Sequence, residues 1–247
     1  MKTQKQVTIL YEDEKIFALD KPSGLLVIRD RWDKNEEILK DWVIKKLGKP
    51  AWPVHRLDRD ASGVILFAKD SPTRNFIEQQ FQDRKIHKIY HVFVQGEVAD
   101  SQGRIDFPLR PDPHHPGRVE MSKVGKDSLT EYEVCERFKG VTFLKVMPHT
   151  GRQHQIRVHL QSIGFPVLCD FFYGSGRPYC LSEMKRFYKR KEDELEKPLM
   201  DRLALHASEI TFLMEDGTPK TIEAPLPKDF SIFLKYLKKF WGKFSRP

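Results

Sequence analysis

Cysteine is scarce in this chain of 247 residues, which holds only Cys135, Cys169 and Cys180. An odd and sparse set of thiols fits a reducing compartment better than a disulfide scaffold, so we expect a cytoplasmic protein. The sequence also contains no Cys-x-x-Cys pair. Since zinc fingers and zinc knuckles need such closely spaced ligands, both classes are disfavoured.

Long apolar runs are absent as well. The longest uninterrupted run is Val64–Ala68, which is far below the ~20 residues that a membrane-spanning helix needs. Residues 1–10 hold two lysines but neither an apolar stretch nor a small-residue cleavage site, so we expect no secretory signal. We therefore expect no membrane as a partner.

Short motifs that mark common enzyme classes are missing too. No GxGxxG, P-loop or GxSxG sequence occurs, and Gly174–Gly176 lacks the spacing of any of them. Nucleotide cofactors and a serine-hydrolase elbow are therefore disfavoured, and we expect no cofactor. His154 and His159 are five residues apart, roughly 500° of helical rotation, so they would not share a helix face. A metal site would need these two histidines, His55 and His149 to converge in the fold, and we expect no metal.

Positive charge is what the sequence has in surplus. Lys plus Arg number 43 and Asp plus Glu number 35, so the net charge is 43 − 35 = +8 and the pI is about 9.3. A basic surplus suggests a polyanionic partner, nucleic acid first, although net charge alone reports on partners only loosely. Hydrophobic residues at 39% and charged residues at 32% are typical of a soluble globular protein with a real core.

The spacing of apolar residues predicts both strands and helices. Strands are predicted at 7–27 (broken by a turn at 22–24), 64–68, 89–94, 130–137, 141–147, 203–214 and 220–223. The last four form two hairpins, around Lys139-Gly140 and Asp216-Gly217. Helices are predicted at 36–47, 71–84, 151–163, 183–196 and 228–241. For the second of these helices, Ser71 is the predicted N-cap and Pro72 the first helical residue.

Hairpin strands with interspersed helices predict an α+β fold with a largely antiparallel mixed sheet, flanked by helices and loops. Residues 109–127 are rich in Pro, His, Gly and Lys and are predicted to form a long loop. No linker divides the chain, so we expect a single domain over 1–247.

Two segments concentrate reactive side chains. Residues 55–63 read HRLDRDASG and place two arginines and two carboxylates within five positions. As a bare pattern this is typical of a solvated, salt-bridged turn. Residues 150–160 read TGRQHQIRVHL and contain two arginines and no acid. As a bare pattern this indicates either a positive helix face over the core or a phosphate contact together with an arginine that holds a catalytic carboxylate.

Taken together, these segments resemble the RluA-type family of RNA pseudouridine synthases. The resemblance covers about residues 7–230. It rests on KPSGLLV at 21–27, HRLDRDASG at 55–63, KIYHVFVQG at 88–96, HTGRQHQIRVHLQSIGFPVLCDFFYG at 149–174, RLALHA at 202–207 and EAPLPKDF at 223–230. It implies the pseudouridine synthase catalytic fold with a central active-site cleft.

The resemblance also implies an activity and its catalytic residues. The reaction isomerises uridine to pseudouridine within RNA, and it needs no cofactor because no group is added or removed overall. The essential carboxylate is the Asp of HRLD, here Asp58. Its partner is the Arg of HQIR, here Arg157, and the active-site aromatic is the Tyr of KxY, here Tyr90. An adjacent cation would keep such a carboxylate ionised in a partly buried site.

Substrate contacts are implied for residues around these three. Enzymes of this family flip the target base out of the RNA fold, which costs roughly a few kcal/mol in lost base stacking. We expect Arg56 and Arg152 to contact the displaced nucleotide or its phosphates, His55 to belong to the same binding surface, and Leu205 to line the pocket. Asp60 is assigned to structure. The expected partner is ribosomal or transfer RNA, and the expected state is a monomer.

The sequence departs from the family pattern at three positions. Ala61 stands where Thr is usual, Val92 where Ala is usual, and Cys169 where Gly precedes the Asp of the common Gly-Asp pair. None of these residues is assigned a chemical role, so the departures concern packing. Because the catalytic pattern begins almost at residue 7, we expect no S4-type RNA-binding domain ahead of it.

Two appendages complete the predicted domain. Residues 182–202 form a charged insertion with 7 basic and 6 acidic residues, and residues 228–247 form a basic amphipathic C-terminal helix. Two windows without any acid carry the charge surplus: 145–169 with three bases and 230–247 with five. We therefore predict two RNA-facing surfaces, the wall of the Asp58 pocket and the outer face of the last helix.

Two other functions fit parts of the pattern. One is a non-catalytic RNA-binding module on the same fold, but retention of Asp58, Tyr90 and Arg157 argues against it because binding a polyanion needs no carboxylate. The other is a metal-dependent hydrolase that uses the histidines, which would lose its activity in chelator.

Overall fold

The computed structural model describes residues 7–29, 37–185, 187–188 and 195–241. Backbone contacts divide the chain into two compact units, each built from two segments: 1–90 with 206–225, and 91–205 with 226–247. Both β5 (His87–Gln95) and β11 (Leu205–Leu213) run from one unit into the other. The single domain expected over 1–247 stays a prediction.

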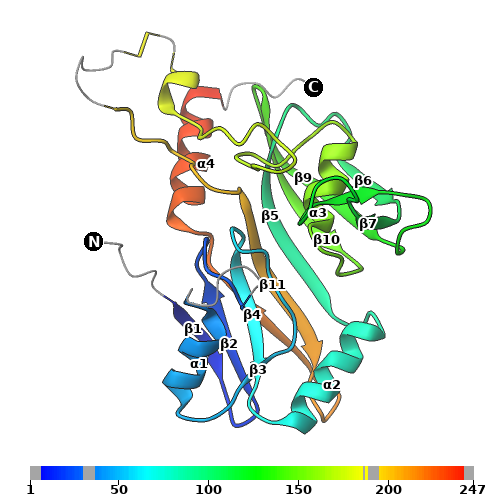
Figure 1. Cartoon of the computed structure of the whole chain (residues 1–247). Coiled ribbons are helices and arrows are strands. Elements are labelled where there is room, and N and C mark those ends of the chain that lie inside the picture. Colours follow the sequence, from blue (N-terminus) through cyan, green and yellow to red (C-terminus); the bar gives the residue numbers. More distant parts are fainter. Residues whose placement is uncertain (1–6, 30–36, 186, 189–194, 242–247) are drawn as a thin grey trace. The chain divides into compact units, whose positions relative to one another are not determined.

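The first unit is a sheet with strand order β1-β2-β4-β11, in which β3 pairs with β4 and β12 with β11 (Figure 1). All these pairings are antiparallel except the parallel pairing of β4 with β11. Besides β11, its elements are β1 (Thr8–Glu12), β2 (Ile16–Lys21), α1 (Leu39–Leu47), β3 (Trp52–Pro53), β4 (Ser62–Ala68), α2 (Ser71–Gln82) and β12 (Pro219–Glu223).

Strand β4 is the centre of this core, because every residue from Ser62 to Ala68 is buried. Its close approach to β11 depends on Gly63, which has φ +114° and pairs with Ala207. A Cβ atom at residue 63 would lie 2.1 Å from the Ala207 carbonyl oxygen. Only glycine fits there, since it alone tolerates both this backbone angle and this contact.

The helices of the first unit follow the predicted ranges with small corrections. Helix α1 buries Leu39 and Val43 and ends at Gly48 in the left-handed conformation, while the start predicted at residue 36 lies outside the described residues. The prediction that Ser71 caps α2 is wrong by one position. The Asp70 carboxylate accepts the Thr73 backbone N–H at 2.7 Å, which satisfies an otherwise unpaired donor of the first turn.

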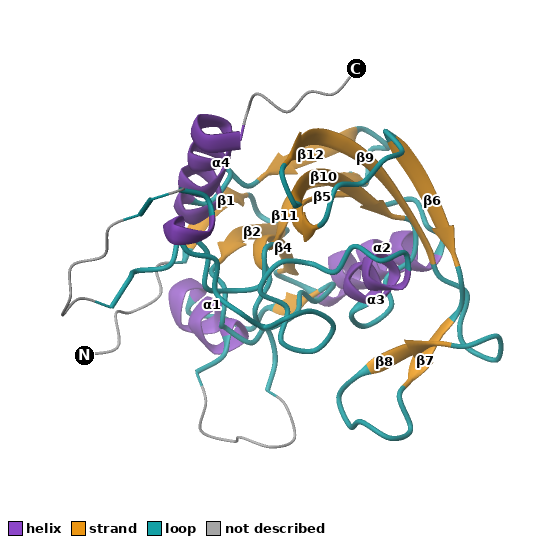
Figure 2. Ribbon diagram, turned by 90° about the horizontal axis from the view of Figure 1, so that it is seen from above, coloured by secondary structure: helices purple, strands orange, loops and turns teal. Residues whose placement is uncertain are grey.

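The second unit is built on the long β9–β10 hairpin, with β6 on the outer side of β9 and β5 beside β10. Strands β7 and β8 form a separate two-stranded ribbon, which projects from this sheet in Figure 2. The elements are β6 (Gln102–Asp106), β7 (Leu109–Pro111), β8 (Val119–Met121), β9 (Leu129–Phe138), β10 (Val141–Pro148), α3 (Gln155–Ser162), the 3-10 turn η1 (Leu181–Glu183) and α4 (Lys228–Trp241). The pairing within both units confirms an α+β fold with mostly antiparallel strands.

Three predictions in the second unit are corrected. The loop at 109–127 contains the paired strands β7 and β8. Helix α3 begins at Gln155 and not at 151, because His154 adopts the left-handed conformation with φ 52°. The predicted helix at 183–196 is wrong over its described residues, where the only regular element is the short turn η1; residues 186 and 189–194 lie outside the described part.

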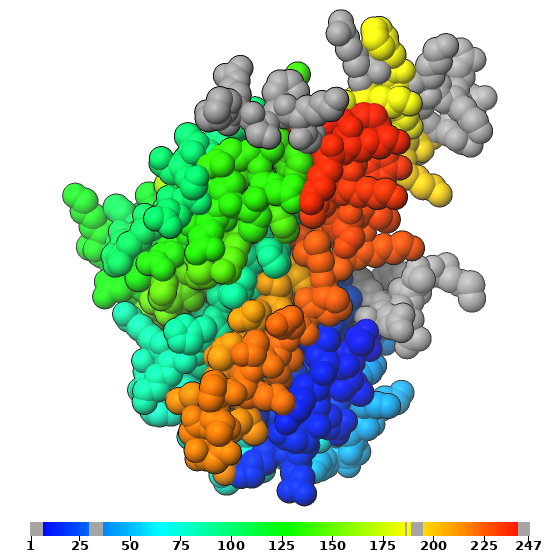
Figure 3. Space-filling view, turned by 180° about the vertical axis from the view of Figure 1, so that it is seen from behind, coloured from blue at the N-terminus to red at the C-terminus, as the bar shows by residue number. Residues whose placement is uncertain are grey.

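Helix α4 matches its prediction at 228–241. Phe230 and Phe233 are fully buried and contact the Phe93 ring of β5, with centroids 5.2 and 4.9 Å apart. Figure 3 shows α4 in red against the green strands that include β9. No helix within the described residues is long and apolar enough to cross a membrane. Residues 242–247 of the predicted basic tail lie outside the described part.

Candidate active site

Asp58 lies half-buried on the loop between β3 and β4, and this loop is held by the turn that follows β2. Lys21, which is fully buried, donates from Nζ to the carbonyl oxygens of Pro22, Leu25 and Arg59 at 3.0, 2.8 and 2.9 Å. The Gly24 N–H also donates to the Arg59 oxygen at 2.8 Å. The backbone immediately after Asp58 is therefore fixed by a buried ammonium group and a turn amide.

Two more side chains hold this loop. The Ser23 hydroxyl donates to the Asp60 carbonyl oxygen at 2.7 Å. The Leu66 N–H donates to His55 Nε2 at 3.0 Å, and the His55 ring packs on Phe81. Burial, reinforced by the charge of Lys88, lowers the pKa of His55 to about 3. His55 is therefore a neutral acceptor that anchors the loop, and its predicted substrate contact stays a prediction.

Tyr90 is a half-buried residue of β5 in the first unit, and the charge of Asp58 acts on it. Burial, followed by the negative charge of Asp58, raises the pKa of the Tyr90 phenol well above its ordinary value of 10.0. Lys88 is two residues earlier on β5, hence on the same strand face, and burial lowers its pKa to about 8. Tyr90 is thus a neutral phenol at neutral pH, and the catalytic roles of Tyr90 and Asp58 stay predictions.

Arg157, the third predicted catalytic residue, is on α3 in the second unit. Its Nε and Nη2 donate to Oδ2 and Oδ1 of Asp170, each at 2.7 Å, and both residues are buried. The Phe172 and Tyr173 rings lie 5.4 and 5.1 Å from the guanidinium carbon. This bidentate pair fixes the orientation of Arg157. Pairing of Arg157 with Asp58 stays a prediction.

The other polar residues of the TGRQHQIRVH segment anchor α3 to the sheet. The Gln155 amide donates to the Leu129 carbonyl and the Thr130 hydroxyl, and its Oε1 accepts from the Thr150 hydroxyl. His159 bonds through Nδ1 to Thr130 and through Nε2 to the Phe107 carbonyl, while burial lowers its pKa. These side chains are structural, so within this segment only Arg152, Gln153, His154 and Arg157 present chemistry outside the core.

The remaining predicted contact residues lie in different settings. Arg56 is exposed, as expected for a group that meets substrate. Arg152 is also exposed, and its Nε donates to the Asp127 carbonyl at 3.1 Å. Leu205 is 4% exposed, as a residue that packs in the core would be. Its predicted role in lining the pocket stays a prediction.

The acid-free sequence windows do not form simple positive surfaces. Lys145 pairs with Glu133 at 3.3 Å, Arg157 with Asp170, and Lys238 of α4 with Glu136 at 2.7 Å. Since the acids come from other parts of the chain, the sequence windows overstate the positive charge that these residues present.

The four candidate histidine ligands have separate partners. His149 pairs with Glu131 at 2.8 Å and His154 bonds to the Tyr173 hydroxyl at 2.9 Å, whereas His55 and His159 make the contacts given above. Within the described part of the chain, no three His, Cys, Asp or Glu side chains gather as a possible ion cage.

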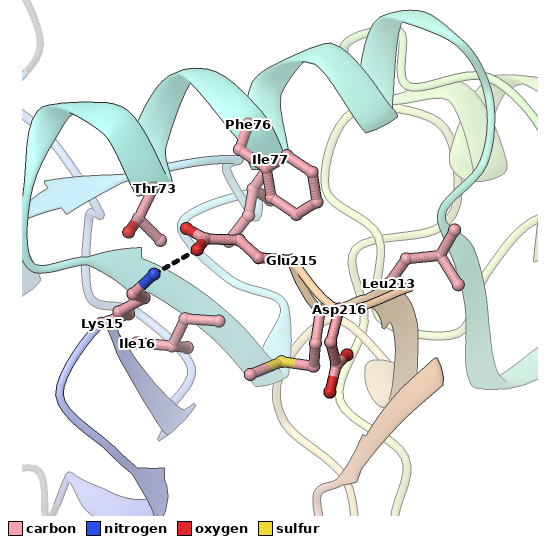
Figure 4. Close-up of a pocket in the computed structure, with 9 residues that line it drawn as sticks. Lys15, Ile16, Thr73, Phe76, Ile77, Leu213, Glu215 and Asp216 are labelled. Atoms are coloured by element: carbon pink, nitrogen blue, oxygen red, sulfur yellow. Dashed lines mark hydrogen bonds and ion pairs between the residues drawn. The ribbon is translucent and has the colours of Figure 1, made fainter. Parts of the chain in front are cut away.

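A pocket of about 240 Å³ in the first unit lies apart from the predicted site residues. Figure 4 shows it between α2 and the β11–β12 turn, with Phe76, Ile77 and Leu213 on its walls and the Lys15–Glu215 ion pair across it. Because its lining is mainly apolar and includes neither an aromatic hydroxyl nor a buried carboxylate, we do not assign the chemistry to it.

Three residues that hold the Asp58 loop or Arg157 were not singled out from the sequence: Lys21, Ser23 and Asp170. The KPSG turn was noted as part of the resemblance but was given no role, and its buried lysine becomes visible only when the Asp58 loop is placed against it. Asp170 follows Cys169, which stands where the family usually has Gly. Its pairing with Arg157, 13 positions away in the sequence, has no local signature.

Comparison with known proteins identifies the family. The model of the RNA pseudouridylate synthase family matches residues 15–162, so the chain belongs to the RNA pseudouridine synthases, which are isomerases. Its similarity to RluA enzymes places it among the RluA-type members of that family. The dual-specificity RNA pseudouridine synthase RluA of Vibrio cholerae is 36% identical over 215 residues, which cover 83% of this chain and 77% of that protein.

Two further comparisons define the extent of the likeness. Ribosomal large subunit pseudouridine synthase D of Neisseria meningitidis is 32% identical over 93% of this chain, and the match spans 61% of that longer relative. The solved structure of human RNA pseudouridylate synthase domain containing 1 has a TM-score of 0.72 and 22% identity, with 98% of this chain and 91% of that chain covered. The second comparison bears on the fold alone.

Proposed function

We propose that this chain isomerises uridine to pseudouridine in ribosomal or transfer RNA, with Asp58 as the essential carboxylate. The proposal is supported by the family match over residues 15–162 and by the anchored Asp58 loop, which Lys21 and His55 hold and whose charge acts on the half-buried Tyr90. The printed name of the Neisseria relative specifies the large ribosomal subunit, which supports ribosomal RNA as the first substrate to test. Such a substrate is consistent with the expected cytoplasmic location.

The chemistry conserves every atom of the uridine. The bond from N1 to C1′ breaks, the uracil turns, and C5 forms the new bond to C1′. The proton on C5 is lost and N1 gains one, so no cosubstrate is needed. Asp58 acts as an ionised carboxylate, either by attacking the nucleotide or by stabilising positive charge that develops at C1′.

Tyr90 and Arg157 serve that carboxylate. Because Tyr90 is a neutral phenol, it can stack on the uracil and donate a hydrogen bond, but it does not act as a resting base. The bidentate pair with Asp170 fixes the orientation of the Arg157 guanidinium. The pairing of Arg157 with Asp58 rests on the family resemblance.

Exposed basic side chains in the HRLD and TGRQHQIRVH segments are proposed to contact the RNA. Arg56 and Arg152 are the proposed phosphate contacts, and Leu205 and His55 the proposed pocket contacts. Phosphate contacts of this kind position the RNA without reading its sequence.

The decisive experiment substitutes Asp58→Asn in the full chain. RNA labelled with tritium on uracil C5 releases the label when pseudouridine forms, because the C5–H bond breaks. We expect the variant to release none and to bind the RNA as the parent does. Asp60→Asn is the matched control, a nearby exposed carboxylate in the same loop, and should keep activity. Full activity in Asp58→Asn would refute the assignment, and RNA binding without any release by the parent would favour the non-catalytic module.

A further inference from the structure

Phe171 is an exposed aromatic side chain in the turn that follows α3 in the second unit. It is 79% exposed, whereas its neighbour Asp170 is fully buried. Burial of a phenylalanine side chain is favourable, and here the ring stays in water although the backbone that carries it is anchored. The proposed catalytic chemistry does not use it.

The backbone that carries Phe171 is held on both sides. The Asp170 carboxylate accepts the N–H groups of Phe172 and Tyr173 at 2.8 and 3.1 Å, and the Asp170 carbonyl accepts those of Gly174 and Gly176 at 3.1 and 3.0 Å. The Arg157 fork holds the same carboxylate. The turn that carries Phe171 is therefore anchored through Asp170, which accepts four backbone hydrogen bonds and forms one bidentate ion pair. An anchored backbone reduces the entropy lost when a ligand binds.

Glycine at position 176 allows the ring to take this position. A Cβ atom there would lie 3.2 Å from Phe171 Cδ2 and 3.4 Å from its Cα. The ring thus lies next to a bare backbone, and most of its surface remains accessible. Such a fixed, open aromatic surface suits a flat ligand.

One cation, Arg118, lies near Phe171 through the neighbouring aromatic ring. The Phe172 ring is 6.2 Å away, and the Arg118 guanidinium carbon is 5.3 Å from that ring. The chain from 171 to 182 includes Arg177 and no acid. Single-stranded nucleic acid is bound by this combination, in which an aromatic side chain stacks on a base while basic groups follow the backbone.

We propose that Phe171 is a stacking platform for an unpaired base of the RNA, with Arg118 near it for a phosphate. The inference rests on the proposed function for the identity of the ligand as RNA. It assigns substrate binding to Phe171, a residue within the 149–174 stretch to which the resemblance gave no role.

The test measures RNA binding in the full chain carrying Asp58→Asn, so that the RNA is not converted. The probe is a stem-loop RNA with a single-stranded loop, and affinity is followed by fluorescence anisotropy. Phe171→Ala should weaken binding roughly 5- to 150-fold, the range expected for loss of one base–aromatic stack. Phe171→Trp should restore it, whereas Phe171→Leu should not. Phe187→Ala is the matched control, since Phe187 is 83% exposed, and it should bind as the parent does.

A second readout separates binding from chemistry. In the chain with Asp58 intact, Phe171→Ala should raise KM for RNA by a similar factor and leave kcat unchanged, because the base on Phe171 is stacked equally in the ground and transition states. Equal affinity in Phe171→Ala and the parent would overturn the inference while leaving the proposed function intact. Rescue by leucine, or an equal loss in Phe187→Ala, would also overturn it. Absence of RNA binding by the parent would overturn both.

Discussion

Replacing Asp170 with alanine should destabilise the second unit more than any exposed charge substitution. Asp170 has no exposed side-chain surface and the Arg157 side chain is 8% exposed, with both contacts at 2.7 Å. Removing one member of a buried, hydrogen-bonded pair costs about 3–5 kcal/mol. That is a large part of the ~5–15 kcal/mol by which proteins are usually stable.

Urea unfolding measures this loss. With a slope of about 2–3 kcal/mol per molar urea, the midpoint should fall by roughly 1–2 M. Asp170→Asn should lose less, because its amide oxygen can still accept the Phe172 and Tyr173 N–H groups. Asp106→Ala is the control: its pair with Arg104 is 2.9 Å long but about 60% exposed, and exposed pairs contribute about 0–1 kcal/mol. A loss below about 1 kcal/mol in Asp170→Ala would refute the reasoning.

Two further predictions concern the first unit and the turn before Asp170. The unfolded chain binds a proton at His55 near pH 6.5, whereas the folded chain does not until about pH 3. Stability should therefore fall as pH drops below 6.5, by up to about 1.4 kcal/mol per pH unit. His55→Gln should flatten this slope in urea unfolding at successive pH values, and parallel slopes would contradict it. Cys169 has φ 58°, so Cys169→Gly should be more stable than Cys169→Ala by roughly 0.5–1 kcal/mol. Thermal melting compares the two, and the opposite order would show that the turn carries no such strain.

The elements predicted well are those whose signal is local. The hairpins around Lys139-Gly140 and Asp216-Gly217 have their turn residues between alternating strands, and Gly140 and Gly217 have positive φ as such turns require. Helix α4 was predicted with its observed bounds because Phe230, Phe233 and Leu237 form one buried stripe. In these cases neighbouring residues determine the structure.

The elements predicted poorly depend on distant partners. Strands β7 and β8 are three residues each, too short to show a period, and Tyr173 fixes one of them by accepting the Val119 N–H at 2.8 Å. The same hydroxyl bonds to His154, whose left-handed backbone delays the start of α3. No local sequence pattern predicts a contact between residues so far apart in the chain.

The candidate site divides in the same way. Asp58, Tyr90 and Arg157 came from the family resemblance, since the bare pattern at 55–63 equally predicted a solvated turn. The side chains that hold them, such as Lys21 and Asp170, are ordinary residues in sequence terms. Their importance arises from burial and from the charge or carbonyl groups that they face.

The buried ammonium group of Lys21 links two stretches of chain into one cooperative element. It donates to Pro22 and Leu25 in its own turn and to Arg59, 38 positions later. Opening either stretch leaves a charged group in the interior without part of its coordination, so the two should exchange their amide protons together and not one after the other. The order of the Asp58 loop thus depends on the turn at the end of β2, and a substitution in that turn would disturb Asp58 without a change in the loop itself.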